Sequence, residues 1–254
     1  MMEDTLRLAK KLISIPSTIG DTSAAEGFML DLLSGMKGCE AELVPVKGIG
    51  NSVVARTVHE PDRPTVLING HLDTVEVCNG WTRDPFRPSQ EGDRLYGLGS
   101  ADMKSGVASM IAAAEAIVKS GAKLKGDLII TAVADEETGS AKGTRHLIER
   151  GLKADMAVVS EPTDLRIEIA HKGILWAEIT TKGRGSHASR PHLGVNAIDK
   201  MNAIINALHE IKLEGYNPLF DVPQPVLSVT TITGGTKINV IPDQCKIEFD
   251  RRLL

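Results

Sequence analysis

Two stretches of the sequence decide the fold: TVLINGHLD at residues 65–73 and LIITAVADEE at residues 128–137. The first opens with a strand-like run, and the second opens with a continuous apolar run that is typical of a strand covered on both faces. Each run ends in groups that can do chemistry. His71 and Asp73 follow the first, and Glu136 and Glu137 follow the second. We therefore expect two buried strands whose ends carry reactive side chains.

Helical and strand-like patterns alternate around these stretches. We expect helices over residues 6–13, 103–118 and 141–150, and another that Ser23 caps and that runs through residues 28–33. Further strands are expected over residues 53–56 and 156–159. Such alternation argues for an α/β layered domain with a largely parallel sheet, and we place it at residues 1–172.

The pattern changes after Lys172. Strands are expected over residues 174–181, 226–233 and 245–249, with a long helix over residues 195–211. This order suggests a smaller α+β domain with an antiparallel sheet, at residues 173–254. Because the sequence stops within a strand pattern at Leu254, we expect this second domain to be incomplete at its C-terminus.

Composition excludes several classes of function. A net charge of −4 offers no basic field for nucleic acid or anionic lipid, and with 3% aromatic residues a base-stacking surface is not expected. No apolar run reaches the roughly 18–20 residues of a membrane span. The N-terminus lacks the pattern of a signal peptide. The cysteines, Cys39, Cys78 and Cys245, lack C-x-x-C spacing, so we expect reduced thiols in a cytoplasmic protein.

Imidazole and carboxylate groups recur where the expected strands end. They are His71, Asp73, Glu136, Glu137 and Glu161, and Asp102 opens the helix expected from residue 103. Taken singly, each is usually a helix cap, a charged first turn or a surface loop. Caps do not explain a histidine with several carboxylates at successive strand ends, and ligands bind at the carboxyl ends of parallel strands. We therefore expect a metal site, whose nitrogen and oxygen donors suit zinc, cobalt or manganese.

Six ordered segments resemble the metallopeptidase family of acetylornithine deacetylase, succinyl-diaminopimelate desuccinylase, carboxypeptidase G and the aminoacylases. They are GHLDTV at residues 70–75, W-x-x-DPF at 81–86, LYGLGSADMKSG at 95–106, ADEETGS at 134–140, SEPT at 160–163 and HKG at 171–173. The resemblance continues through residues 185–188, 194–197 and 238–243. It implies a phosphorylase/hydrolase-like catalytic domain of the zinc-peptidase type, followed by a lid and dimerisation domain.

The resemblance also implies a role for each matching residue. His71 would bind one metal ion with Glu161, Asp102 would bridge two ions, and Glu137 would bind the second. Asp73 would hold the other ring nitrogen of His71. Glu136 would act as the general base towards a metal-bridging water. The peptide bond after Asp102 would be cis.

In the second domain, the resemblance makes His187 a donor to the oxyanion in a partner subunit's site, which implies a homodimer formed through the lid. Asn239 and Arg252 would hold the substrate's carboxylate. The family's further histidine ligand, near the C-terminus, has no counterpart here. We therefore expect the 254 residues to cover roughly two thirds of a family member, and we do not take activity of the chain alone for granted.

The function expected is metal-dependent hydrolysis of the amide bond of an N-acyl amino acid or a small peptide. Two divalent metal ions are expected, with zinc as the first candidate and cobalt or manganese as the others. A dipeptidase or carboxypeptidase that uses the same site is the alternative within enzymes. A binding protein descended from such an enzyme, or an inactive fragment, is the alternative outside them. The presence of Glu136 speaks against a binding protein, which needs no general base.

Overall fold

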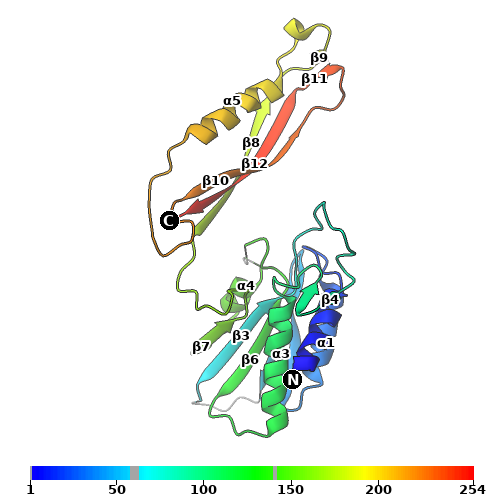
Figure 1. Cartoon of the computed structure of the whole chain (residues 1–254), viewed down its shortest axis with the longest axis vertical. Coiled ribbons are helices and arrows are strands. Elements are labelled where there is room, and N and C mark those ends of the chain that lie inside the picture. The colour runs from blue at the N-terminus through cyan, green and yellow to red at the C-terminus, as the bar shows by residue number, and fades with distance from the viewer. Residues whose placement is uncertain (1, 58–62, 140–141) are drawn as a thin grey trace. The chain divides into compact units, whose positions relative to one another are not determined.

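The computed structural model describes residues 2–57, 63–139 and 142–254. The chain forms two compact units, Met1–Arg166 and Ile167–Leu254, which we call unit 1 and unit 2 (Figure 1). The boundary predicted near Lys172 falls shortly after this division.

Unit 1 is built on a five-stranded mixed sheet in the order β1-β2-β6-β3-β7. These strands span Cys39–Val46 (β1), Gly50–Thr57 (β2), Asp127–Val133 (β6), Thr65–His71 (β3) and Met156–Val159 (β7). β6, β3 and β7 run parallel, whereas β1 and β2 form an antiparallel hairpin that continues antiparallel onto β6. The predicted α/β fold with parallel strands is confirmed, and the hairpin makes the sheet mixed.

Helices cover both faces of this sheet. α1 (Met2–Ile13), α2 (Ser23–Ser34) and α3 (Lys104–Ser120) pack on one face, and α4 (Thr144–Glu149) packs on the other. Along β6 the side chains alternate between the two cores, with Ile130 in the first and Ile129 in the second. Because every residue of β6 is buried, its sequence reads as a continuous apolar run.

Three local features differ from the sequence-based expectation. Ser23 is the first helical residue of α2 and not its cap; Thr22 takes the N-cap position, and its hydroxyl bonds to the Glu26 carboxylate and caps no backbone group. α4 is shorter than predicted, and Ser140 and Ala141 lie outside the described residues. β1 and the small hairpin of β4 (Ser89–Glu91) and β5 (Arg94–Tyr96) were not predicted. All three strands are partly exposed, so no apolar run marks them.

Unit 2 confirms the predicted antiparallel sheet, in the order β10-β12-β8. The strands span Val226–Gly234 (β10), Gln244–Leu253 (β12) and Gly173–Lys182 (β8). α5 (Ala197–Glu210) covers one face, where Met201 packs on Cys245 and Ile247. Its N-terminus is capped by the Asn196 side chain, which accepts hydrogen bonds from two backbone N–H groups. Two short strands, β9 (Ser186–His187) and β11 (Val240–Ile241), pair with each other, and a 3-10 turn, η1 (Pro191–Leu193), follows β9.

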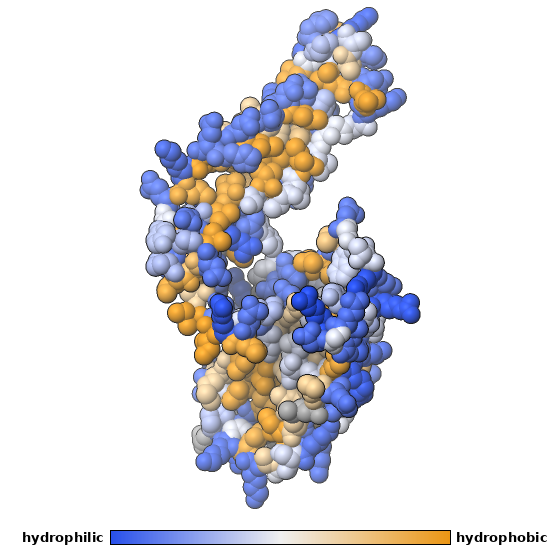
Figure 2. Space-filling view, in the orientation of Figure 1, coloured by the Kyte–Doolittle hydropathy of each residue, from blue (hydrophilic) through white to orange (hydrophobic). Residues whose placement is uncertain are grey.

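Apolar residues are also exposed along one edge of the unit 1 sheet. Among the described strands, β7 pairs with β3 alone, and its residues Met156, Val158 and Val159 are each more than half exposed. Figure 2 shows apolar patches over this part of unit 1 among a largely hydrophilic surface. Within the described residues, no helix is both long and apolar enough to cross a membrane.

Candidate metal centre

The ends of the three parallel strands of unit 1 bring the predicted ligands to one edge of the sheet. His71 is the last residue of β3 and pairs with Val133, the last residue of β6. Glu137 lies in the turn that follows β6. Beyond the end of β7, the Ser160 backbone N–H still donates to the Asn69 carbonyl of β3, at 3.1 Å. Glu161 therefore leaves the sheet beside His71.

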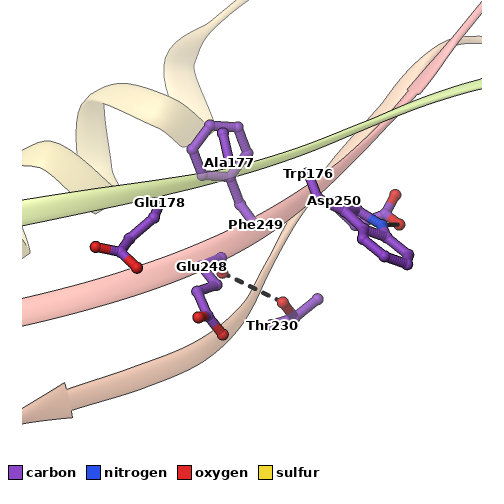
Figure 3. Close-up of a pocket in the computed structure, with 7 residues that line it drawn as sticks. All are labelled: Trp176, Ala177, Glu178, Thr230, Glu248, Phe249 and Asp250. Atoms are coloured by element: carbon purple, nitrogen blue, oxygen red, sulfur yellow. Dashed lines mark hydrogen bonds between the residues drawn. The ribbon is translucent and has the colours of Figure 1, made fainter. Parts of the chain in front are cut away.

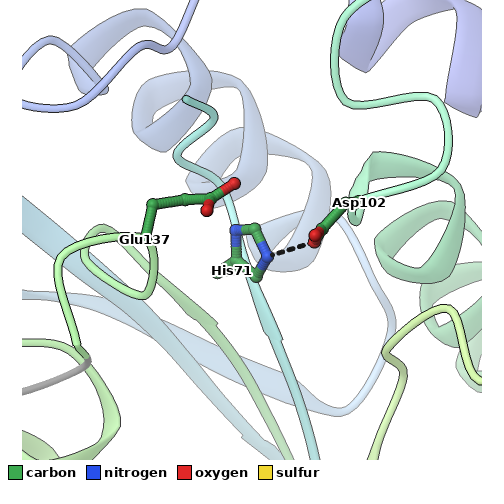
Figure 4. A group of neighbouring side chains, drawn as sticks. All are labelled: His71, Asp102 and Glu137. Carbon is green, nitrogen blue, oxygen red and sulfur yellow. Dashed lines mark hydrogen bonds and ion pairs between the residues drawn. The ribbon is translucent and has the colours of Figure 1, made fainter. Parts of the chain in front are cut away.

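One imidazole and three carboxylates converge at this edge. His71, Asp102 and Glu137 each offer a ligand atom, and these atoms all lie within 4.8 Å of one another (Figure 4). The Nε2 atom of His71 is 3.0 Å from Asp102 Oδ1 and 3.8 Å from Glu161 Oε1. The structure thus brings together all four residues predicted as metal ligands.

The charges at this edge fit a bound cation. Burial lowers the pKa of His71, but Asp102, Asp73 and Glu161 outweigh it and raise that pKa to about 10. Burial, together with the Asp102 and Glu136 carboxylates, raises the pKa of Glu161 to about 7. Burial and Asp102 also raise the pKa of Glu137. These carboxylates crowd one imidazole, and a divalent cation would neutralise their repulsion with the nitrogen and oxygen donors that zinc accepts.

Hydrogen bonding of the buried His71 ring leaves one nitrogen for a metal. Nδ1 lies 2.8 Å from the main-chain carbonyl oxygen of Asp73 and 3.3 Å from the Asp73 carboxylate. We infer that Nδ1–H donates to the carbonyl, which leaves Nε2, on the side of Asp102, as the nitrogen that would bind a metal. The ring is thereby held through the backbone of Asp73 as well as through its side chain.

The Asp73 carboxylate has a second task that sequence reasoning missed. It accepts hydrogen bonds from the backbone N–H groups of Glu136, at 2.9 Å, and of Glu137, at 3.0 Å. Burial opposes its ionisation, but the bonds from His71, Glu136 and Glu137 hold the pKa of Asp73 below its usual value. One buried carboxylate therefore fixes both the histidine and the turn that presents the two glutamates.

Asp135 holds the same turn from its other side. Its buried carboxylate accepts the Thr138 hydroxyl and, at 3.0 Å, the Lys142 backbone N–H. Glu136 is half-buried in this turn, and its charge raises the pKa of both Glu137 and Glu161. The Glu136 carboxylate is therefore within electrostatic range of Glu137 and Glu161.

Asp102 is presented by the glycine-containing loop that runs from β5 to α3. Gly97 and Gly99 have positive φ angles of 155° and 78° there, which suit residues without a Cβ. The peptide bond between Asp102 and Met103 is cis, as the resemblance implied. The Asp102 side chain is 56% exposed, so it faces outward from the loop into the space beside His71.

His187, Asn239 and Arg252 all lie in unit 2. His187 is exposed in β9, and Ala188 beside it donates its N–H to the Asn239 carbonyl, at 2.9 Å. The His187 ring lies 2.8 Å from the hydroxyl of Ser189, two residues further along the chain. Arg252 Nε donates to Asp250, at 2.8 Å. The predicted substrate and oxyanion roles of these three residues stay predictions.

A groove of about 560 Å³ lies on the sheet of unit 2 (Figure 3). It is lined by residues of β8, β10 and β12, among them Trp176, Glu178 and Glu248. Both of these glutamates are paired with Lys246, and Trp176 Nε1 donates to Asp250. The carboxylates of the groove are thus paired with a lysine or an indole N–H, and its lining contains no histidine or cysteine.

Comparison with known proteins agrees with the geometry. Residues 67–250 match peptidase family M20/M25/M40. The chain is 34% identical to an acetylornithine deacetylase of Edwardsiella ictaluri over 260 residues, which are 98% of this chain and 67% of that protein. The chain thus spans about two thirds of the length of that relative.

Solved structures share the fold at lower identity. An M20 family metallo-carboxypeptidase from Sulfolobus solfataricus superposes with a TM-score of 0.76 at 20% identity, over 99% of this chain and 71% of that one. A dinuclear metal-binding peptidase of the M20 family from Bacillus subtilis superposes with a TM-score of 0.57 at 20% identity, over 98% and 63%. The chain therefore belongs to peptidase family M20/M25/M40 and is a metallohydrolase of that family.

Proposed function

We propose that the chain carries the metal centre of an N-acyl amino acid amidohydrolase, with His71, Asp102, Glu137 and Glu161 as ligands of two divalent cations. The observation that carries this proposal is the convergence of one imidazole and three carboxylates next to Glu136. Zinc suits these donors best, and cobalt or manganese would also accept them. Asp102 would be a ligand shared by both cations.

The chemistry that the cations supply when bound is polarisation of the scissile carbonyl and a lowered pKa of the attacking water. Glu136 accepts a proton from this water as the water oxygen bonds to the carbonyl carbon. It then passes the proton to the amine nitrogen as the carbon–nitrogen bond breaks, which releases a carboxylic acid and a free amine. Asp73 keeps Glu136 and Glu137 in place through their backbone N–H groups.

The first candidate substrate is N-acetylornithine, because acetylornithine deacetylases align over 98% of the chain. In unit 2, we assign Asn239 and Arg252 to the substrate's carboxylate and His187 to the oxyanion in a partner subunit of a homodimer. Arginine suits a carboxylate because its planar guanidinium donates two parallel hydrogen bonds. The cysteines are all free, which supports a reducing, cytoplasmic setting.

The test of this proposal is hydrolysis by zinc-loaded and cobalt-loaded protein of three substrate classes: N-acetyl amino acids, N-succinyl amino acids and dipeptides. We expect release of acetate from an N-acetyl amino acid. Faster cleavage of dipeptides would make the chain a dipeptidase that uses the same residues. Binding of a small carboxylate without turnover of any substrate would favour a binding protein or an inactive fragment.

Glu136→Gln distinguishes the proposed mechanism from simple metal binding. Glutamine keeps the shape but cannot accept the proton, so kcat should fall by about 10²–10⁴-fold, with unchanged metal content. Glu137→Gln should lower both kcat and the content of the second cation. The matched control is Glu149→Gln, on the exposed surface of α4, which should change neither. Near-full activity of Glu136→Gln would refute the assigned base.

A further inference from the structure

Lys104 is completely buried beside the metal centre. It is the first residue of α3, shortly after Asp102, and its exposure is 0%. Its ammonium donates to the main-chain carbonyls of Leu12, at 3.0 Å, and Ile15, at 2.7 Å. Within the described part of the chain, both of its acceptors are therefore backbone groups at the end of α1.

A lysine at this position opposes two general tendencies. Lysine is almost never fully buried without a charged partner, and a cation at the N-terminus of a helix is disfavoured by the helix dipole. Burial is the cause that lowers the pKa of Lys104, to about 8. The Leu12 carbonyl, however, lies in the last turn of α1, where carbonyls lack helical partners and carry negative partial charge. Lys104 thus caps the C-terminus of α1 from another helix.

The same residue fixes the backbone next to Asp102. The Lys104 N–H donates to the Gly99 carbonyl, at 2.9 Å, and closes the loop that carries Asp102. Met103, which lies between Asp102 and Lys104 in the sequence, is fully buried, and its sulfur lies 3.3 Å from the backbone nitrogen of His71. The Asp102 side chain is more than half exposed, so packing around the carboxylate contributes little to its position. We attribute the position of the Asp102 carboxylate to the anchored backbone behind it.

We infer that Lys104 is a positioning residue of the metal centre: it ties the main chain beside Asp102 to the end of α1 and so sets where the Asp102 carboxylate meets His71. This inference rests on the proposed function, because it assigns Asp102 to the cations. Lys104 touches neither substrate nor metal. Its effect passes through the loop geometry and should therefore appear in metal binding and not only in turnover.

The experiment compares Lys104→Met with two control variants by cobalt titration calorimetry and by the visible absorption spectrum of the cobalt-loaded protein. Methionine keeps the aliphatic length but removes the donors. We expect cobalt affinity to fall about 10–100-fold, as for groups that orient a ligand from outside the metal shell, with a changed spectrum. Lys119→Met, exposed on the same helix, should leave both unchanged.

Ile111→Ala separates positioning from general loss of stability. Ile111 is fully buried on α3 in the core of unit 1, so its truncation destabilises the fold without touching the Asp102 loop. We expect this variant to keep the cobalt spectrum and an affinity within about threefold of the unaltered chain, an estimate that treats distant sites as independent. If Ile111→Ala and Lys104→Met lose affinity in proportion to their loss of stability, the inference is wrong.

Three other outcomes are also decisive. If Lys104→Met does not fold, Lys104→Gln, which keeps a donor on a shorter stem, replaces it. If neither variant folds, Lys104 is required for folding itself, and the inference is overturned. Absence of cobalt binding by the unaltered chain would refute the proposed function itself, whereas normal binding by Lys104→Met would refute only the positioning role.

Discussion

Replacing Asp73 by asparagine tests how the centre is held together. The Asp73 side chain is 1% exposed and accepts the backbone N–H groups of Glu136 and Glu137. Hydrogen bonds to a charged group contribute about 1.5–3 kcal/mol each. Asparagine keeps one acceptor but turns an amide N–H₂ towards the remaining donors. We therefore expect Asp73→Asn to lower the free energy of unfolding by about 2–5 kcal/mol, the range in which loss of one buried partner lies.

The assay is equilibrium urea unfolding of the metal-free protein, followed by zinc titration calorimetry. Because Asp73 also faces Nδ1 of His71, zinc affinity should fall about 10–100-fold. Asp84→Asn is the matched control, since Asp84 also accepts a backbone N–H, that of Phe86 at 2.9 Å, but in an exposed loop. The control should cost under about 1 kcal/mol. Equal effects of the two substitutions would refute the role given to Asp73.

Two further perturbations address the charge and the packing of the centre. The pKa of His71 is raised from 6.5 to about 10 and that of Glu161 from 4.5 to about 7, so both groups keep their protons to higher pH in the folded metal-free chain than in the unfolded one. The free energy of unfolding should therefore fall as pH rises from about 5 to 8, while zinc affinity rises; above pH 8 the lowered pKa of Lys104 opposes the contribution of His71. Urea unfolding and zinc titration at several pH values check this, and a stability that increases over the range would contradict it. A Cβ on Gly106 would lie 2.1 Å from the Ser160 carbonyl oxygen, so Gly106→Ala should cost about 1–3 kcal/mol by overpacking and weaken metal binding through Glu161. Gly27→Ala, a helical glycine with open space around it, should be neutral or stabilising by up to about 1 kcal/mol, as thermal unfolding of both would show.

The three strands that lead to the site could be predicted from the sequence because each is rich in apolar residues. β6 is buried at every residue and reads as an unbroken apolar run; β3 runs parallel to β6 and β7 parallel to β3, which brings His71 and Glu161 to one edge. β1 escaped prediction because it is an edge strand with mostly exposed side chains. The apolar and polar residues alternate only over residues 39–43, which is a short signal for a strand.

Tertiary contacts explain what sequence reasoning missed at the site. The hydrogen bonds that Asp73 accepts from the Glu136 and Glu137 backbone join residues far apart in the chain. They depend on the register of β3 with β6. The buried position of Lys104 was not predicted. A signal was present, because the first turn of α3 has no acidic residue and opens with a cation, against the helix dipole.

A crystal soaked in zinc, with anomalous diffraction recorded at the zinc edge, tests the central claim most directly. The account predicts an anomalous peak bonded to His71 Nε2 and to an Asp102 carboxylate oxygen, at about 2.0–2.2 Å, with Glu161 or Glu137 completing the ligands. The peak should disappear in His71→Ala. A well-ordered crystal with no peak at this edge of the sheet, or with zinc bound only at surface residues such as Cys78, would contradict the account.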